Sequence, residues 1–451
     1  MTPARRDEHR LTFLDESALE LQLVTGRAPL IQIIWVYEHP VDGAGLERFH
    51  RNFFASIAGR AIERSPLPFG RARWVRPQTP PPPIHGLTAP PRPREEMLAW
   101  ADGLRTLPID PLRGPSCYLA TQSFTDGATA VSIVAAHAIG DGVGGMMAIF
   151  EAVTGNIRNP GYDSAGARSR GRAMLADFRQ AMRDLPMTTR TAVKAAKMFR
   201  AQRRDAPRAA GTAVAVRDDR QVVMPSVAIY IDAADWDARA EALGGNSYSM
   251  LAGFAAKLAE HLGRLRAADG KASLLIAINL RESLEDDRAL AMAFATAHVD
   301  PAAVAGDLTE ARDAVRDARQ KAKTEPDPTI EILPLMPWLP RRAVKGLADQ
   351  MFAYSEDLPV SCSNLGDLPA EISMVDGTPA EYVFVRGMDT GVTMADLERS
   401  HGQLVVVSAR INGKVSITVE SYQLGADNST VRLKELATAT LSEFGLSGVV
   451  V

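Results

Sequence analysis

The sequence has few cysteines and no long apolar run. Only two of its 451 residues are cysteine, Cys117 and Cys362, and both lie in apolar, strand-like contexts far apart in the chain. We expect inert buried thiols there and, without a CxxC pair or a His/Cys cluster, no metal site. Nowhere do about eighteen apolar residues follow one another, so no membrane-spanning helix is expected. The opening MTPARRDEHRLTF carries charge with no apolar stretch behind it, which argues against a signal peptide.

The remaining composition is that of a folded protein of the reducing cytoplasm. Hydrophobic residues make up 46% of the chain, a normal share for a globular protein. The length exceeds what one core usually supports, so roughly two to three units are expected. We place an N-terminal unit at 1–158, a basic, partly helical connection at 159–220 and a C-terminal unit at 221–451.

Charge is unevenly distributed along the chain. The net charge is −3, yet the segment 168–208 holds twelve Arg and Lys against three Asp. Its apolar residues Leu175, Phe178 and Met182 recur at helical spacing, and Pro186 and Pro207 are expected to break the helix into pieces. Two interpretations stay open: a solvated connection, or weak contact with an anionic membrane surface that would place the protein at a membrane periphery. Nucleic acid is disfavoured, because no binding motif accompanies the charge.

Strands and helices alternate in both halves, which predicts an α/β fold in two layers. In the first half we expect helices at 44–64 and 95–106, a helix that begins near Gly142, and strands at 30–37, 117–124 and 129–136. In the second half we expect helices at 247–264, 308–323 and 428–444, and strands at 222–231, 274–279, 359–364, 382–385, 403–410 and 415–422. The two halves are therefore similar in architecture, although no sequence repeat relates them.

One short segment carries chemistry: His137-Ala138-Ile139-Gly140-Asp141-Gly142, at the end of the strand 129–136. A neutral imidazole is well suited to act as a general base near neutral pH. Asp141 can fix the loop by accepting backbone amides at the helix start or by pairing with an arginine. Gly142 lets backbone approach closely. A histidine at a purely structural strand-to-helix turn is the alternative.

This segment resembles the HxxxDG motif shared by chloramphenicol acetyltransferase, peptide-synthetase condensation domains and the wax ester synthase/diacylglycerol acyltransferase family. Further similarities to the last family follow in its order along the chain. They are the stretch 107–115 (LPIDPLRGP), Gly245-Asn246 before an Ala-rich helix, 277–281 (AINLR) and 363–366 (SNLG). Ser247-Tyr248 departs from the Asp-Val that the family has at its helix start, and Ala136 replaces the first of the two histidines that family members often carry.

The resemblance implies two chloramphenicol-acetyltransferase-like subdomains with an active-site tunnel between them. His137 would be the general base in that tunnel, and Asp141 would be structural, with Arg281 as its candidate partner. Asn279, Arg281, Ser363 and Asn364 are the candidate substrate-binding residues. A turn-forming role is the alternative for Ser363 and Asn364.

The implied reaction is transfer of an acyl group from acyl-CoA to a hydroxyl acceptor, forming a wax ester or a triacylglycerol-type lipid. No metal and no cofactor besides the acyl-CoA substrate is expected. Two rival functions stay open. The first is a stand-alone condensation-type enzyme with a carrier-protein-bound donor or an amine acceptor. The second is a non-catalytic lipid-binding protein of the same fold, which the change at Ala136 slightly favours.

Overall fold

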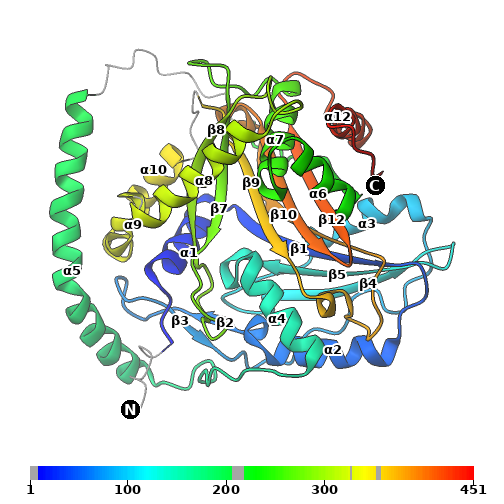
Figure 1. Ribbon diagram of the computed structural model, residues 1–451. Helices are drawn as coiled ribbons and strands as arrows, with labels where there is room; N and C mark the ends of the chain where they lie inside the picture. The colour runs from blue at the N-terminus through cyan, green and yellow to red at the C-terminus, as the bar shows by residue number, and fades with distance from the viewer. Residues whose placement is uncertain (1–8, 206–217, 326–327, 352–356) are drawn as a thin grey trace.

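The computed structural model describes residues 9–205, 218–325, 328–351 and 357–451; within these, the side chains of 196–205, 328–329 and 348–351 are left out. Two sheets form its centre, the first in the lower half of Figure 1 and the second in the upper half. No helix in the described part of the chain is long and apolar enough to cross a membrane.

The first sheet has four antiparallel strands, in the order β10 (Tyr382–Thr390), β1 (Ala28–Tyr37), β5 (Thr129–Ala136) and β4 (Cys117–Ser123). Helices α2 (Gly43–Ala55) and α4 (Gly142–Thr154) cover one face, and α3 (Met97–Gly103) packs on the other. Because both faces are covered, β1 is apolar nearly throughout rather than alternating.

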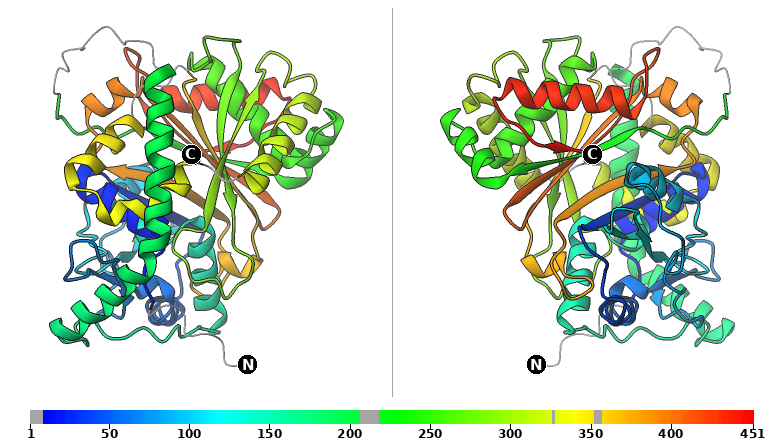
Figure 2. Two further views of the ribbon diagram at one scale, coloured as in Figure 1. Left: turned by 90° about the vertical axis from the view of Figure 1, so that its left-hand side faces the viewer. Right: turned by 90° about the vertical axis from the view of Figure 1, so that its right-hand side faces the viewer.

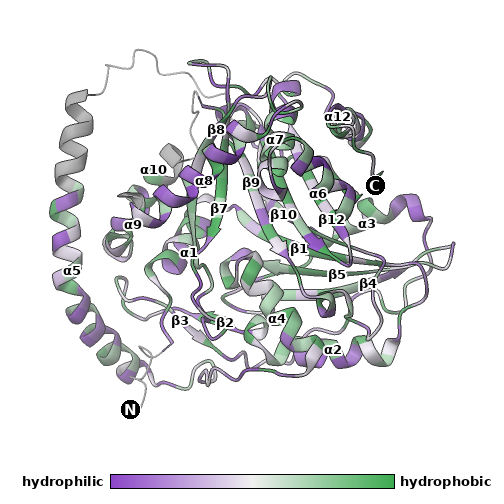
Figure 3. Ribbon diagram, in the orientation of Figure 1, coloured by the Kyte–Doolittle hydropathy of each residue, from purple (hydrophilic) through white to green (hydrophobic). Residues whose placement is uncertain are grey.

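The second sheet has seven strands: β13 (Val449–Val450), β6 (Ser226–Asp232), β12 (Lys414–Tyr422), β11 (Gln403–Ile411), β9 (Val360–Asp367), β7 (Ala272–Asn279) and β8 (Met292–Val299). Strand β9 runs parallel to both neighbours, and the other pairs are antiparallel. The largest hydrophobic core of the described structure lies between this sheet and four helices: α6 (Ala233–Ala242), α7 (Ser247–His261), α8 (Thr309–Thr324) and α12 (Thr430–Glu443). Strands β5 and β7 are mostly hydrophobic along their length (Figure 3).

Strand β10 joins the two halves of the chain. It comes from the second half but pairs with β1 in the first sheet, where Val385 lies opposite Ile33. Arg386, 1% exposed, donates to Gln32 of β1 at 2.7 Å and to Ser226 of β6 at 2.5 Å. The expected unit at 221–451 therefore contributes a strand to the sheet of the unit at 1–158.

Smaller elements complete the fold. Helix α1 (Phe13–Thr25) packs against α10 (Arg341–Met351), and β2 (Ala61–Glu63) pairs with β3 (Arg73–Val75). The short helices are α9 (Pro328–Glu331) and α11 (Met394–Arg399).

Two of the expected helices are shorter than predicted. The helix expected at 44–64 ends at Ala55, because extended Ser56 caps the 3-10 turn Ile57–Gly59, which leads into β2. The helix expected at 95–106 is α3 alone, with a 3-10 turn on each side. The remaining predicted strands and helices are present, with ends shifted by a few residues. Strand β8 and helix α6 were not predicted.

The basic connection forms one long helix, α5 (Arg170–Asp205), on one side of the molecule (Figure 2, left). The prediction that Pro186 breaks this helix is wrong. Proline removes one helical hydrogen bond, but Pro186 is exposed, so water can satisfy the freed carbonyl, and α5 bends along its length (Figure 1). Pro207 lies outside the described residues.

Helix α5 turns its polar and small residues inward. Asp177 is buried and accepts from Arg10 at 2.9 Å and Ser65 at 2.5 Å. Ala173, Thr188 and Thr191 are buried on the same side. Six large apolar residues of this helix are exposed instead; they are Met174, Leu175, Phe178, Met182, Met187 and Val193.

Candidate active site

The HxxxDG segment bridges β5 and α4. Strand β5 ends at Ala136, residues His137–Ile139 form a 3-10 turn, and α4 begins at Gly142 with Asp141 as its N-cap. Ala136 is 3% exposed and lies opposite Leu30 of β1. The alanine that stands in place of the first histidine is therefore packed within the sheet.

Asp141 is the best-bonded residue of the segment. Its side chain is buried and accepts from the amides of Gly144 at 2.8 Å and Ala291 at 3.0 Å. Arg281 donates to both carboxylate oxygens, at 2.7 Å each. The pairing of Asp141 with Arg281 that the resemblance implied is thus present, and so is the bonding of amides at the helix start.

Both terminal nitrogens of the buried Arg281 guanidinium are hydrogen-bonded inside the protein. Its side chain is 3% exposed and also donates to the carbonyls of Arg288 at 2.8 Å and Ala289 at 3.1 Å. This placement supports the role of partner to Asp141 and gives no support to the expected contact of Arg281 with substrate.

Residues 280–291, the loop between β7 and β8 in the second half of the chain, are hydrogen-bonded to the motif loop. The amide of Asp141 donates to the carbonyl of Ala289 at 2.9 Å, and the amide of Leu290 donates to Asp15 at 2.8 Å. Burial raises the pKa of Asp15, and the Leu290 hydrogen bond opposes that shift. The geometry of the motif therefore depends on both halves of the chain.

Arg60 is a further anchor that the sequence did not reveal. It is 2% exposed and donates to the carbonyl of Ile139 at 2.7 Å, to Tyr162 at 3.0 Å and to the carbonyl of Asp287 at 2.6 Å. Its guanidinium lies 3.8 Å from the centre of the Trp74 ring. No local signal marks this arginine, because all its partners are distant in sequence.

The imidazole of His137 stands apart from these contacts. It is partly exposed, and no group in the described part of the chain hydrogen-bonds it. The segment thus combines a rigidly bonded carboxylate with a histidine whose two ring nitrogens are available to a bound molecule.

Strand β9 brings Ser363 and Asn364 toward the motif, but on opposite faces of the sheet. Leu365 contacts the motif helix, since one of its methyl carbons lies 2.8 Å from the place of a Cβ at Gly142. Ser363 shares the face of Leu365, because side chains alternate along a strand. Asn364 points to the other face, and its Oδ1 accepts from the amide of Gly366 at 2.8 Å. Ser363 is therefore the better-placed of the pair.

Asn279 lies at the exposed end of β7, where its Oδ1 accepts from the amide of Arg281 at 3.1 Å. This bond shapes the turn that carries Arg281 toward Asp141. Gly142 stands at the first position of α4, where its amide is not needed within the helix.

A small apolar cavity of about 40 Å³ lies behind the motif loop. Its wall consists mainly of aliphatic and aromatic side chains, including Ile31, Ile33, Phe53, Ile133 and Ile149, with Arg60 and Arg288 at the edge. Its size suits a short apolar group only.

Metal-binding clusters of three or more His, Cys, Asp or Glu are absent from the described residues. Cys117 and Cys362 are both buried, and burial raises the pKa of each thiol to about 12. Neither is a nucleophile at neutral pH.

Comparison with known proteins gives matches among solved structures only; no family model and no curated protein matches the chain. The first condensation domain of the CDA synthetase superposes with a TM-score of 0.53 at 15% identity, over 98% of this chain and 99% of that one. The wax ester synthase/diacylglycerol acyltransferase from Marinobacter aquaeolei VT8 superposes with a TM-score of 0.55 at 14% identity, over 96% and 98%. The chain has the condensation-domain fold.

The condensation-domain fold confirms the fold class expected from the sequence, an α/β arrangement like that of the HxxxDG acyltransferases. A nonribosomal peptide synthetase, FmoA3, has the same fold over 99% of this chain and 46% of its own, with a TM-score of 0.53 at 13% identity. At these identities the likeness concerns the fold, and the chemistry has to be argued from the site itself.

Proposed function

We propose that the chain is an acyltransferase that moves an acyl group from a thioester to a hydroxyl acceptor, with His137 as general base. One observation carries this proposal: Arg281 and the loop 280–291 fix Asp141 and the turn beside it, while none of the described residues hydrogen-bonds the imidazole of His137. A purely structural histidine would be expected to have such a partner when it lies so close to the core.

In the proposed reaction His137 accepts the proton of the acceptor hydroxyl as its oxygen attacks the thioester carbonyl. The carbonyl becomes a tetrahedral oxyanion, which needs hydrogen-bond donors. The amides of Gly142 and Val143 at the start of α4 are candidates, because within this helix Asp141 accepts from the amides of Gly144 and Gly145. Collapse of the intermediate breaks the carbon–sulfur bond, and His137 returns its proton to the leaving thiolate. No acyl-enzyme and no metal is required.

The exposed surface of α5 supports one class of acceptor. Helix α5 presents an apolar stripe of Met174, Leu175, Phe178, Met182 and Val193, since residues three, four and eighteen apart share a face. A basic stripe runs beside it, made of Arg172, Arg179, Arg183, Arg190 and Lys194, all exposed. This pattern is typical of helices that lie on anionic membranes. We therefore favour a lipid-like alcohol, giving a wax ester or a triacylglycerol-type product, reached at a membrane surface.

Two other functions compete. A condensation-type enzyme would take its acyl group from a carrier protein or transfer it to an amine. By their names, one structural neighbour above is a condensation domain of a synthetase and another is a nonribosomal peptide synthetase. A non-catalytic lipid-binding protein would keep the fold and bind acyl groups without turnover.

The test is a substrate panel. The purified chain is incubated with acyl-CoAs of graded length, or with an acyl thioester of a carrier protein, and with alcohols or amines. Products and free CoA are measured by mass spectrometry. Ester and free CoA in equal amounts are expected. Product from carrier-bound donor alone would favour the condensation-type enzyme, and acyl binding without product would favour the lipid-binding protein.

A further inference from the structure

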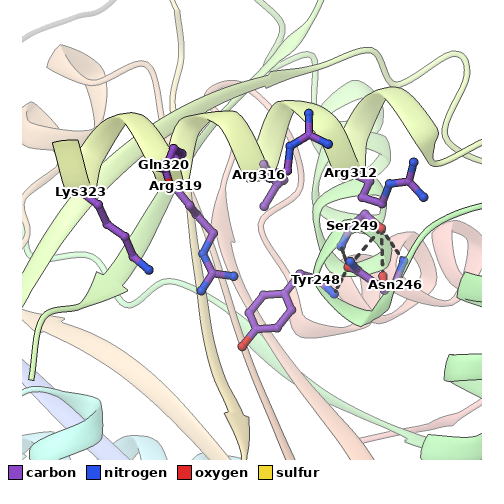
Figure 4. A pocket seen from close by; sticks show the side chains of 9 residues that line it. Asn246, Tyr248, Ser249, Arg312, Arg316, Arg319, Gln320 and Lys323 are labelled. Carbon is purple, nitrogen blue, oxygen red and sulfur yellow. Dashed lines mark hydrogen bonds between the residues drawn. The ribbon is translucent and has the colours of Figure 1, made fainter. Parts of the chain in front are cut away.

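A second pocket, of about 360 Å³, lies between the start of α7 and the outer face of α8 (Figure 4). Four of its nine lining residues are cationic, and none of the nine is acidic: Asn246, Tyr248, Ser249, Arg312, Val315, Arg316, Arg319, Gln320 and Lys323. It is distinct from the small apolar cavity behind the motif loop.

The cations form a row along α8. Arg312, Arg316, Arg319 and Lys323 follow at spacings of four, three and four, so they share one face of the helix. Like charges at this spacing destabilise a helix. Asp313 and Asp317 offset this repulsion at Arg312 and Arg316, but not at Arg319 and Lys323, where an anionic ligand would offset it.

Two of the four charges, those of Arg312 and Arg316, are paired with carboxylates of α8, since Arg312 lies 3.7 Å from Asp313. The other two are not paired with a carboxylate in the described part of the chain. Arg319 lies over the ring of Tyr248, 4.7 Å from its centre, and in the described part of the chain Lys323 has no ion-pair partner. Arg316 pairs with Asp313 and Asp317, which face away from the pocket lining, and Arg312 donates to the carbonyl of Gly244 at 2.8 Å.

The backbone amides at the start of α7 are not available to bind an anion in this pocket. Asn246 already accepts from the amides of Tyr248 and Ser249, at 3.0 Å each. Side-chain cations, above all Arg319 and Lys323, would carry the recognition.

The pocket is next to the strand that touches the motif. The hydroxyl of Tyr248 lies 3.5 Å from the place of a Cβ at Gly366, at the end of β9. Leu365, one residue earlier, contacts Gly142 of the motif. A long molecule seated in the pocket could thus extend along the end of β9 toward His137.

We infer that this pocket binds the phosphates of the acyl-CoA donor, whose nucleotide end carries several phosphate groups. Guanidinium and ammonium groups recognise phosphate by charge-assisted hydrogen bonds. A carrier protein presents its pantetheine through a single phosphodiester, which would use less of a row of four cations. The inference rests on the proposed function, and it selects CoA as the donor.

The experiment compares Arg319→Gln and Lys323→Gln with Lys321→Gln, which makes the same charge change on α8 outside the pocket. Calorimetry measures binding of CoA, 3′-dephospho-CoA, pantetheine and inorganic phosphate to each protein. Affinity for CoA should fall about tenfold in each pocket variant, as expected for the loss of one charge-assisted contact, and stay unchanged in Lys321→Gln. Pantetheine affinity should not change in any variant.

Equal CoA affinity in all variants, or no CoA binding by the wild type, would overturn the inference. So would loss of inorganic phosphate binding with unchanged CoA binding, because the pocket would then bind free phosphate only. Measuring binding as well as turnover keeps this inference separate from the proposed function. If turnover with acyl-CoA is the same in the Arg319 and Lys323 variants as in the wild type, only the pocket assignment is rejected. If CoA binding depends on these residues but no turnover occurs, only acyl transfer is rejected.

Discussion

Arg281 holds both carboxylate oxygens of Asp141 at 2.7 Å, although 140 residues separate the two. The ion pair connects the turn after β7 in the second half to the motif loop in the first. Both side chains are 3% exposed, so neither charge is solvated if the other is removed.

Replacing Asp141 by Asn should therefore destabilise the fold at least as much as it harms activity. It leaves the Arg281 guanidinium buried without its counter-charge, which typically costs about 3–5 kcal/mol. Urea unfolding and local hydrogen exchange measure the loss. Unchanged stability and exchange with abolished turnover would mean that Asp141 acts directly in the chemistry.

Gly144 and Gly145 offer a matched test of how tightly this pair is packed. A Cβ at Gly144 would lie 3.0 Å from Arg281 Nη2 and 3.4 Å from Asp141 Oδ1, whereas a Cβ at Gly145 meets nothing within 4 Å. Gly145→Ala should stabilise α4 by about 0.5–1 kcal/mol, the usual gain in a helix. Gly144→Ala should lose that gain or reverse it. Equal stabilisation by both substitutions, measured by thermal unfolding, would show that the pair has room to move.

The exposed stripes of α5 predict salt-sensitive binding to anionic vesicles. Replacing Arg179, Arg183, Arg190 and Lys194 by Gln should abolish flotation with acidic vesicles, because each basic residue near such a surface contributes about 1 kcal/mol. Lys197 and Arg200 belong to the same basic segment, but their side chains lie outside the described residues.

The apolar stripe has its own variant and control. Phe178→Ser, at a residue 50% exposed, should weaken flotation, whereas Val431→Ser on α12, at a residue 69% exposed, should not. Turnover of a water-soluble acceptor should be preserved in all these proteins. Equal flotation with acidic and neutral vesicles at low salt would mean that α5 is only a solvated connection between the two halves of the chain.

Glu420 predicts a pH dependence of stability. Burial raises its pKa from 4.5 to about 8, and the nearby Arg386 opposes the shift. The folded state therefore binds a proton that the unfolded state has released, so this contribution to stability is complete below pH 4.5 and is lost as the pH rises through about 8.

Glu420→Gln should flatten that loss: its unfolding midpoint should fall less than the wild type's between pH 5 and pH 9. Glu435→Gln, at a side chain 62% exposed, is the control and should follow the wild type. Parallel pH profiles for Glu420→Gln and wild type would show that this carboxyl is ionised in the folded protein.

The sequence predicted what local pattern determines. Periodicity and turn residues located most strands and helices, and the resemblance of the HxxxDG segment and its companions to a known family implied that Asp141 and Arg281 are partners. The placement of β10 in the first sheet could not be predicted, because a strand's composition does not say which strand it pairs with. Arg60 was missed for the same reason, since its contacts at Ile139, Tyr162 and Asp287 depend on the tertiary fold.

Exposure was equally hidden from the sequence. The apolar residues of α5 predicted an amphipathic helix, and an apolar face usually packs inward. Here Asp177 and the threonines occupy the inner side, because Arg10 and Ser65 offer buried partners to the carboxylate. The proposed membrane contact of α5 depends on this arrangement, in which the polar side faces inward and the apolar side faces solvent.

The most direct test of the account is single-turnover transfer by His137→Ala, with circular dichroism and thermal unfolding to establish that the variant is folded. General-base loss should lower the rate constant by about a hundred- to ten-thousand-fold. Because no group in the described part of the chain bonds the imidazole, the unfolding midpoint should change little. A folded His137→Ala protein that keeps more than about a tenth of wild-type turnover would contradict the assignment of His137 as the base.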